Sequence, residues 1–184
     1  MNPTDALQKL MAGNTRYVSS TMNSQNTPSD RVRHAQGQAP IAAIIRCADS
    51  RVAPEIVFDQ PLGNLFVCGV AGNIPTEEIV ESLEYAVDHL GTKLIVVMGH
   101  SNCGAVTAAL ASDSPTGLYA KIALSPFLEL DESIAHNAEQ GISSILSQSL
   151  IIDEAVKAGS LQIVAGVQDI ASGEFDLIAQ TQLA

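Results

Sequence analysis

Residues 94–104 read LIVVMGHSNCG, an apolar run that ends in a histidine and a cysteine. The run begins without polar alternation, which is typical of a parallel strand buried on both faces. Residues 41–51 read IAAIIRCADSR and have the same form, with a cysteine, an acid and an arginine directly after the apolar part. Both polar runs therefore follow predicted strands, at the carboxyl ends where open parallel sheets bind their ligands.

Outward from these two runs, predicted strands alternate with predicted helices. Further strands are expected over residues 65–70 and 161–167, followed by a short edge strand or tail. Helices are expected over residues 3–17, 54–58, 76–90, 103–111 and 131–157, with an interruption near Gly141 in the last. This order predicts an α/β fold: a mostly parallel sheet of four to five strands, with right-handed crossovers and flanking helices.

The N-terminal part differs from the rest in its pattern. Apolar residues at helical spacing predict an amphipathic helix over residues 3–17, with Gly13 and Asn14 as its stop signal. Residues 19–38 are rich in Ser, Asn, Thr and Gln, which predicts an extended surface arm. A lone helix of this length is marginal unless it is docked, so we expect it to pack on a neighbouring subunit.

The 184 residues suffice for one sizeable core, so we expect one domain over residues 1–184. Within it, residues 1–38 would form the helical arm and residues 39–184 the catalytic core. With 46% hydrophobic and 16% charged residues, the chain has the composition of a folded globular protein.

Charge and cysteine usage limit the partners and the compartment. The net charge of −11, without a basic patch, argues against nucleic acid and anionic membranes as partners. No apolar run is long enough to span a bilayer. Three cysteines and no apparent secretory signal favour a reducing compartment, so we expect a cytoplasmic protein, with an organelle or microcompartment also compatible.

Cys47, His100 and Cys103 offer two thiolates and one imidazole, a donor set that Zn²⁺ favours. With only three ligands apparent, a fourth position remains for water or for Asp49, which favours a catalytic site over a structural one. Asp49 and Arg51 stand two residues apart and can form a bidentate pair. The alternatives are a purely structural zinc site and an ordinary ion pair.

The C-x-D-S-R run and the G-H-x-x-C-G-A run together resemble those of the β-class carbonic anhydrases. The resemblance covers nearly the whole chain, including Ala71-Gly72-Asn73 and the SLEYA run of residues 82–86. It implies that Cys47, His100 and Cys103 bind zinc, and that Asp49 and Arg51 form an acid–base dyad. It also implies a substrate site, part of it supplied by a second subunit of a homodimer or tetramer, made from Gln38, Phe66, Ala71, Tyr85 and Gly104.

The activity implied by the resemblance is the reversible hydration of carbon dioxide to bicarbonate by zinc-bound hydroxide. The alternative is a carbonyl sulfide or carbon disulfide hydrolase on the same zinc site, because attack on O=C=S needs the same metal and dyad. A third, non-enzymatic alternative is a redox or scaffold module with a coordinatively closed metal.

Several of these residues also have an explanation that involves no role in catalysis or binding. Phe66 and Tyr85 are equally compatible with core packing, and Gln38 with a plain loop. Cys68 is expected to be a buried, unreactive thiol.

Three positions depart from the family pattern: Ile44, Gly69 and Gln168 stand where Trp, Arg and an aromatic residue are common. The first two departures predict that the family's inhibitory bicarbonate site is missing.

Overall fold

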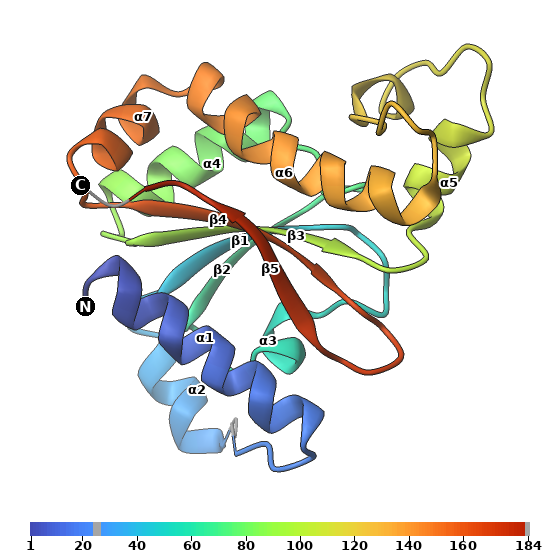
Figure 1. The fold of residues 1–184 in the computed structure, drawn as a ribbon. Helices are drawn as coiled ribbons and strands as arrows, with labels where there is room; N and C mark the ends of the chain where they lie inside the picture. Colours follow the sequence, from blue (N-terminus) through green and yellow to red (C-terminus); the bar gives the residue numbers. More distant parts are fainter. Residues whose placement is uncertain (24–26, 183–184) are drawn as a thin grey trace.

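The structure is a computed structural model of the chain, and it describes residues 1–23 and 27–182. Within these residues, five strands form one sheet in the order β2-β1-β3-β4-β5 (Figure 1). The strands are β1 (Ala42–Arg46), β2 (Leu65–Gly69), β3 (Leu94–His100), β4 (Gln162–Gln168) and β5 (Phe175–Gln180). Strands β1 to β4 are mutually parallel, and β5 is antiparallel to β4. The predicted α/β fold with a mostly parallel sheet is confirmed.

Helices cover both faces of the sheet (Figure 1). They are α1 (Pro3–Val18), α2 (Pro28–His34), α3 (Pro54–Val57), α4 (Glu77–Asp88), α5 (Gly104–Leu110), α6 (Leu130–Gln148) and α7 (Leu150–Lys157), with a 3₁₀ turn η1 (Tyr119–Lys121). Alternate side chains of the strands point to opposite faces. Ile44 and Val96 therefore pack with α1 and α3, whereas Ile45 and Val97 pack with α4, α6 and α7. None of the helices in the described residues is both long and apolar enough to cross a membrane.

The order of the strands has a switch between β1 and β3. From β1 the chain passes through α3 to β2 on one side, whereas from β3 it passes through α5, α6 and α7 to β4 on the other. Open α/β sheets bind ligands beyond the carboxyl ends of the strands at such a switch. Cys47 directly follows β1 and His100 ends β3, so both stand at this point.

Helix α1 is longer than its pattern predicts. Gly13 and Asn14 do not end it, and the helix continues to Val18. A Cβ at Gly13 would overlap the carbonyl oxygen of Phe58, so glycine here permits a close approach to α3. The buried Asn14 amide donates to the carbonyl of Gly173 at 2.8 Å. Both residues therefore serve packing, and the local stop signal is overridden.

The predicted extended arm over residues 19–38 is wrong for part of its length. Pro28–His34 forms α2, which begins with a capping box between Thr27 and Asp30. Residues 24–26 of that arm lie outside the described residues. Packing of the N-terminal helix on a neighbouring subunit stays a prediction, but its premise does not hold: Ala6 and Leu10 of α1 are buried in the core of their own chain. A dimer therefore cannot be argued from an undocked helix.

The break in the long C-terminal helical segment lies at Ser149, and the prediction of a break near Gly141 is wrong. Ser149 caps α7, its hydroxyl accepting the N–H of Ile152 at 3.1 Å. Gly141 lies within α6, where a Cβ would come within 2.8 Å of a methyl group of Val97 on β3. Glycine at this position allows the helix to lie close to the sheet.

Candidate metal centre

Three buried side chains converge at the carboxyl edge of the sheet. Cys47 follows β1, His100 ends β3, and Cys103 is the N-cap residue that directly precedes α5. Between the last two, Asn102 adopts a positive φ of 55°, which turns the chain back towards the edge. The two Sγ atoms and a ring nitrogen of His100 all lie within 4.8 Å of one another. The side chains that the sequence suggested as metal ligands are thus brought together.

The ring of His100 is oriented for ligation. Its Nδ1 lies 2.9 Å from the carbonyl oxygen of Ser101, an arrangement in which Nδ1 carries the proton and donates. Its Nε2 is buried and has no hydrogen-bond partner within the described residues. A buried nitrogen with a free lone pair needs a partner, and a metal ion is one that fits. Ser101 is itself fixed, because its N–H donates to the carbonyl of Gln168 at 2.8 Å.

The two thiols differ in their hydrogen bonds. The Sγ atoms of Cys47 and Cys103 are 4.0 Å apart, and the N–H of Gly72 donates to Cys47 Sγ at 3.3 Å. Donation by the Cys103 thiol and by Gly72 lowers the pKa of Cys47, whereas the same contact raises the pKa of Cys103. Two thiolates and one imidazole form a donor set that fits Zn²⁺.

Asp49 and Arg51 form the expected bidentate pair beside this cluster. Arg51 Nε donates to Asp49 Oδ1 at 2.9 Å, and Nη2 donates to Oδ2 at 2.7 Å. The guanidinium holds the pKa of Asp49 well below its ordinary value, so the carboxyl group is ionised near neutral pH. Oδ2 also lies 3.9 Å from His100 Nε2. An ionised acceptor thus lies beside the three candidate ligand atoms.

Of the predicted substrate-site residues, Ala71 and Gly104 lie next to the cluster. Ala71 precedes Gly72, whose N–H contacts Cys47. Gly104 follows Cys103 as the first residue of α5, and a Cβ there would meet open space. Gly104 is exposed, so the surface beside Cys103 is open to solvent at this residue.

The other three predicted substrate-site residues lie elsewhere in the chain. The exposed Gln38 precedes the amino end of β1, at the opposite end of the strand from Cys47. Phe66 pairs in register with Ala43 and lies 6.2 Å, centroid to centroid, from Tyr85 on α4. Tyr85 is 46% exposed. One chain by itself does not bring these three to the metal cluster.

Sequence reasoning missed Arg46 as a neighbour of the site. Its Nη1 donates to the carbonyl of Cys47 at 2.7 Å, which fixes the backbone of a candidate ligand. Its guanidinium lies against Gly69, the register partner on β2, where a Cβ would be 3.4 Å from the guanidinium carbon. The glycine thus leaves room for Arg46, a relation that only the strand register reveals.

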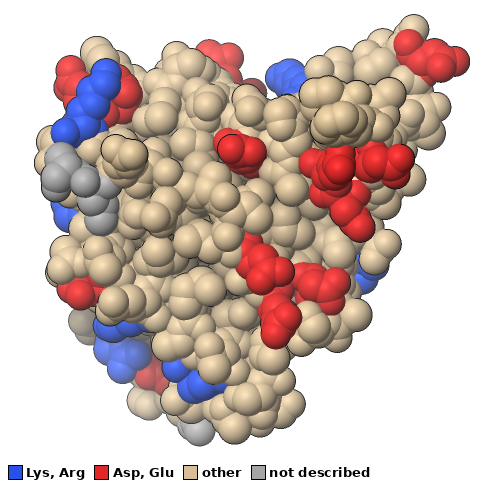
Figure 2. All heavy atoms as spheres, viewed as in Figure 1, with Lys and Arg blue, Asp and Glu red and all other residues tan. Residues whose placement is uncertain are grey.

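The distribution of charge on the molecular surface reflects the acidic composition of the chain (Figure 2). On the face that Figure 2 shows, acidic side chains form several groups, and basic side chains are scattered towards the edge. This face has no broad basic patch among its described residues, which is the feature that binding to nucleic acid requires.

Comparison with known proteins gives one family. The model of the carbonic anhydrase family matches residues 42–128. Carbonic anhydrase 2 of Mycobacterium tuberculosis (strain H37Rv) is 38% identical over 94% of this chain and 91% of its own length. A carbonic anhydrase of Mycolicibacterium smegmatis is 34% identical over 96% of this chain and 93% of its own length.

Solved structures agree with these sequences. A Coccomyxa β-carbonic anhydrase in complex with acetazolamide is 26% identical and superposes with a TM-score of 0.68 over 96% of this chain and 83% of its own. One of the β-carbonic anhydrases from Sordaria macrospora, described as tetrameric, has the same fold, with a TM-score of 0.72 at 24% identity over 97% of this chain and all of its own.

Proposed function

The chain is a member of the β-class carbonic anhydrase family, and from that premise we propose that it catalyses the reversible hydration of carbon dioxide to bicarbonate, with Zn²⁺ held by Cys47, His100 and Cys103. The observation that carries the proposal is the buried cluster of two thiols and an unpartnered histidine nitrogen. Zinc bound there would act as a Lewis acid that lowers the pKa of water to about 7.

Asp49 is the group that handles the proton. Its ionised carboxylate accepts a hydrogen bond from the reacting water and orients it, while Arg51 occupies both carboxylate oxygens. These two hydrogen bonds would keep Asp49 from ligating the metal itself and displacing the reacting water. The oxygen of water forms the new bond to the carbon of CO₂, and the released proton passes to buffer. We assign to the N–H of Gly104 the role of polarising a substrate oxygen.

We propose a homodimer, or a tetramer of paired dimers, in which a second copy completes the apolar pocket. The support is that Gln38 and Tyr85 are exposed and that neither, nor Phe66, lies at the cluster of its own chain. An enzyme of this kind works with reduced thiols, and the three cysteines are free, so we assign it to the cytoplasm. A fully active monomer in sedimentation would refute this assembly.

The experiment that tests the function is turnover by the purified, zinc-loaded protein. We expect one Zn²⁺ per chain and rapid hydration of CO₂ in a stopped-flow assay with a pH indicator. Carbonyl sulfide is assayed beside it, and Cys103→Ala serves as the matched inactive control. Turnover of carbonyl sulfide without hydration of CO₂ would establish the hydrolase alternative. Stoichiometric zinc without either activity would leave only a scaffold role.

A further inference from the structure

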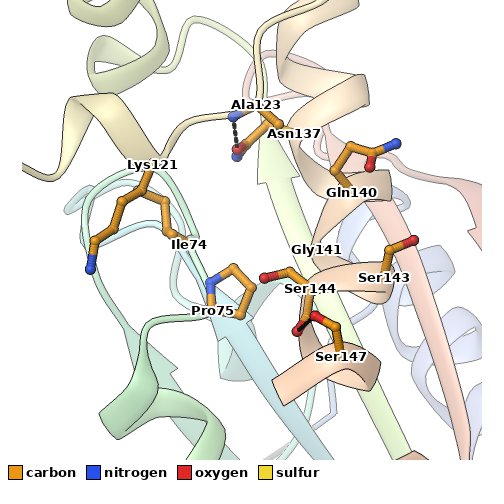
Figure 3. Close-up of a pocket in the computed structure, with 10 residues that line it drawn as sticks. All are labelled: Ile74, Pro75, Lys121, Ala123, Asn137, Gln140, Gly141, Ser143, Ser144 and Ser147. Carbon is orange, nitrogen blue, oxygen red and sulfur yellow. Dashed lines mark hydrogen bonds between the residues drawn. The ribbon is translucent and has the colours of Figure 1, made fainter. Parts of the chain in front are cut away.

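A buried asparagine outside the cluster is connected to it through one glycine. Asn137 on α6 is 5% exposed, and its Nδ2 donates to the carbonyl oxygen of Gly72 at 2.8 Å. Its Oδ1 accepts the N–H of Ala123 at 3.0 Å. Figure 3 shows this second bond at the wall of a pocket between α6 and the segment that follows η1. Both ends of the amide are therefore in use, and the side chain has one orientation.

Gly72 is the residue on which this connection depends. Its N–H donates to Cys47 Sγ at 3.3 Å, and its φ of +80° is open to glycine but strained for other residues. A Cβ there would also lie 3.1 Å from Cδ1 of Ile122. The turn is closed by the N–H of Asn73, which donates to the carbonyl of Val70 at 3.1 Å, and Asn137 adds a bond to the carbonyl of Gly72 itself. The carbonyl bond from Asn137 therefore restrains the turn that aims the N–H at sulfur.

We propose that Asn137 is a positioning residue for the Cys47 thiolate: it holds the Gly72 turn so that the Gly72 N–H points at the sulfur. The inference rests on the proposed function, because it takes Cys47 as a metal ligand. An N–H donor stabilises the charge of a thiolate and fixes the direction of its lone pairs. Groups that orient ligands in this way usually affect metal affinity by about 10- to 100-fold.

A purely structural role is the competing explanation, and the chain contains a control for it. Ser133 lies one helical turn before Asn137 on α6, and its hydroxyl accepts the N–H of Ser125 at 3.1 Å. Like Asn137, it ties the segment after η1 to α6. Unlike Asn137, it has no bond to Gly72 among the described hydrogen bonds. Ser133→Ala therefore loosens the segment and leaves the Gly72 turn held.

The test compares zinc binding and cobalt spectra of the full chain. Asn137→Asp keeps the acceptor for Ala123 and the side-chain shape, and it replaces the donor to Gly72 by a repelling oxygen. Gln140→Glu makes the same amide-to-carboxylate change at an exposed position of α6 that lines the same pocket (Figure 3). Zinc affinity is measured by competition with a chromogenic chelator. Co²⁺ alone then serves as the probe for thiolate-to-metal charge transfer in absorption.

For Asn137→Asp we expect zinc binding about 10- to 100-fold weaker than in the wild type. The charge-transfer band should move to lower energy, because a sulfur without its N–H donor holds its electrons less tightly. Ser133→Ala should lower the melting temperature and leave zinc affinity and the charge-transfer band unchanged. Gln140→Glu should change neither the zinc affinity nor the charge-transfer band. If Asn137→Asp does not fold, Asn137→Ser is measured in its place, since its shorter side chain leaves the Gly72 carbonyl without its donor.

Two outcomes overturn the inference in distinguishable ways. Wild-type zinc affinity and an unshifted cobalt band in the folded Asn137 variant would reduce the residue to a structural role and leave the proposed function intact. A wild-type protein that binds neither Zn²⁺ nor Co²⁺ stoichiometrically would remove the proposed function, and this inference with it.

Discussion

Cysteines occupy two contrasting regions of the same sheet. Cys47 and Cys103 lie at the carboxyl edge, beside an unpartnered histidine nitrogen and the N–H of Gly72. Cys68 lies within β2 among the apolar side chains that face α4 and α6, and it is 9% exposed. Burial raises the pKa of the Cys68 thiol to about 11, whereas hydrogen bonds lower the pKa of Cys47 although it too is buried. Burial without polar contacts thus keeps the Cys68 thiol protonated, whereas hydrogen bonds favour the thiolate of Cys47.

The difference follows from the backbone. The side chain of Cys68 points from the face of the sheet into an apolar layer, where it meets mainly other side chains. Beyond the ends of the strands, backbone groups are free to turn towards sulfur, as Gly72 does. This contrast can be tested at the carboxyl edge and in the apolar layer around Cys68 that faces α4 and α6, here called the Cys68 layer.

Removing one thiol from each region should give the largest difference in zinc affinity and turnover between two variants. Cys103→Ala takes away a ligand atom, so we expect zinc affinity to fall by more than the 10- to 100-fold that is usual for supporting groups, and CO₂ hydration to be lost. Cys68→Ala is the matched control and should keep one Zn²⁺ per chain and wild-type turnover. Metal analysis and stopped-flow assays measure both. Stoichiometric zinc and full activity in Cys103→Ala would show that the assignment of ligands is wrong.

Arg51→Ala should leave the metal in place and remove the support of Asp49. We expect kcat/KM to fall by about 100-fold, the lower range for a displaced proton-handling group. At neutral pH Asp49 stays ionised even without Arg51, so the loss measures orientation and not charge. Zinc content serves as the control and should not change. Wild-type rates in this variant would exclude a catalytic role for the pair.

The same pair has a pH signature in stability. Arg51 lowers the pKa of Asp49 below its ordinary value of 3.8, so the pair stabilises the folded state above about pH 4. That stabilisation is lost as the pH falls through the folded-state pKa. The free energy of unfolding of metal-free wild type should therefore exceed that of Arg51→Ala most at neutral pH, with the two converging in acid. An equal difference at pH 7 and in strong acid would contradict the ion-pair explanation.

The rate of alkylation should show how strongly burial suppresses the reactivity of Cys68. Burial raises the pKa of Cys68 from 9.0 to about 11, which leaves about 100-fold less thiolate at pH 8 than in the unfolded chain. In the zinc-loaded native protein we expect iodoacetamide to label Cys68 at least that much more slowly than in denaturant. Peptide mapping by mass spectrometry gives the rate at each cysteine. Equal rates in the two states would mean that β2 opens readily to solvent.

Much of this contrast could be predicted from the sequence, because it depends on order along the chain. An apolar run followed at once by Cys47, or ending at His100, places each side chain at a strand end, and parallel strands put such ends on one edge. The helix α2 also had a local signal, the Thr27-to-Asp30 capping box, but the polar composition around it favoured an arm.

Other features depend on contacts between distant parts of the chain. The bond from Asn137 to Gly72 joins α6 to the loop after β2, and no spacing in the sequence indicates it. The position of Arg46 over Gly69 follows from the register of β1 and β2. The role of Gly141 is ambiguous in the sequence for the same reason, because a glycine that interrupts a helix and a glycine that allows close packing look alike there.

Gly141→Ala tests that ambiguity in the Cys68 layer. In an open helix this change stabilises by about 1 kcal/mol, but here the new Cβ would lie 2.8 Å from a methyl group of Val97. We expect net destabilisation of about 1–3 kcal/mol, typical of overpacking. Zinc affinity should not change, because Val97 packs in the layer with α4, α6 and α7 and not at the metal cluster. Val97→Ala is the matched background: with that methyl group gone, alanine at 141 should be tolerated, and a double-mutant cycle in denaturant measures the coupling. A rise in stability from Gly141→Ala alone would mean that α6 and β3 do not approach closely, and that Gly141 is only a weak point in the helix.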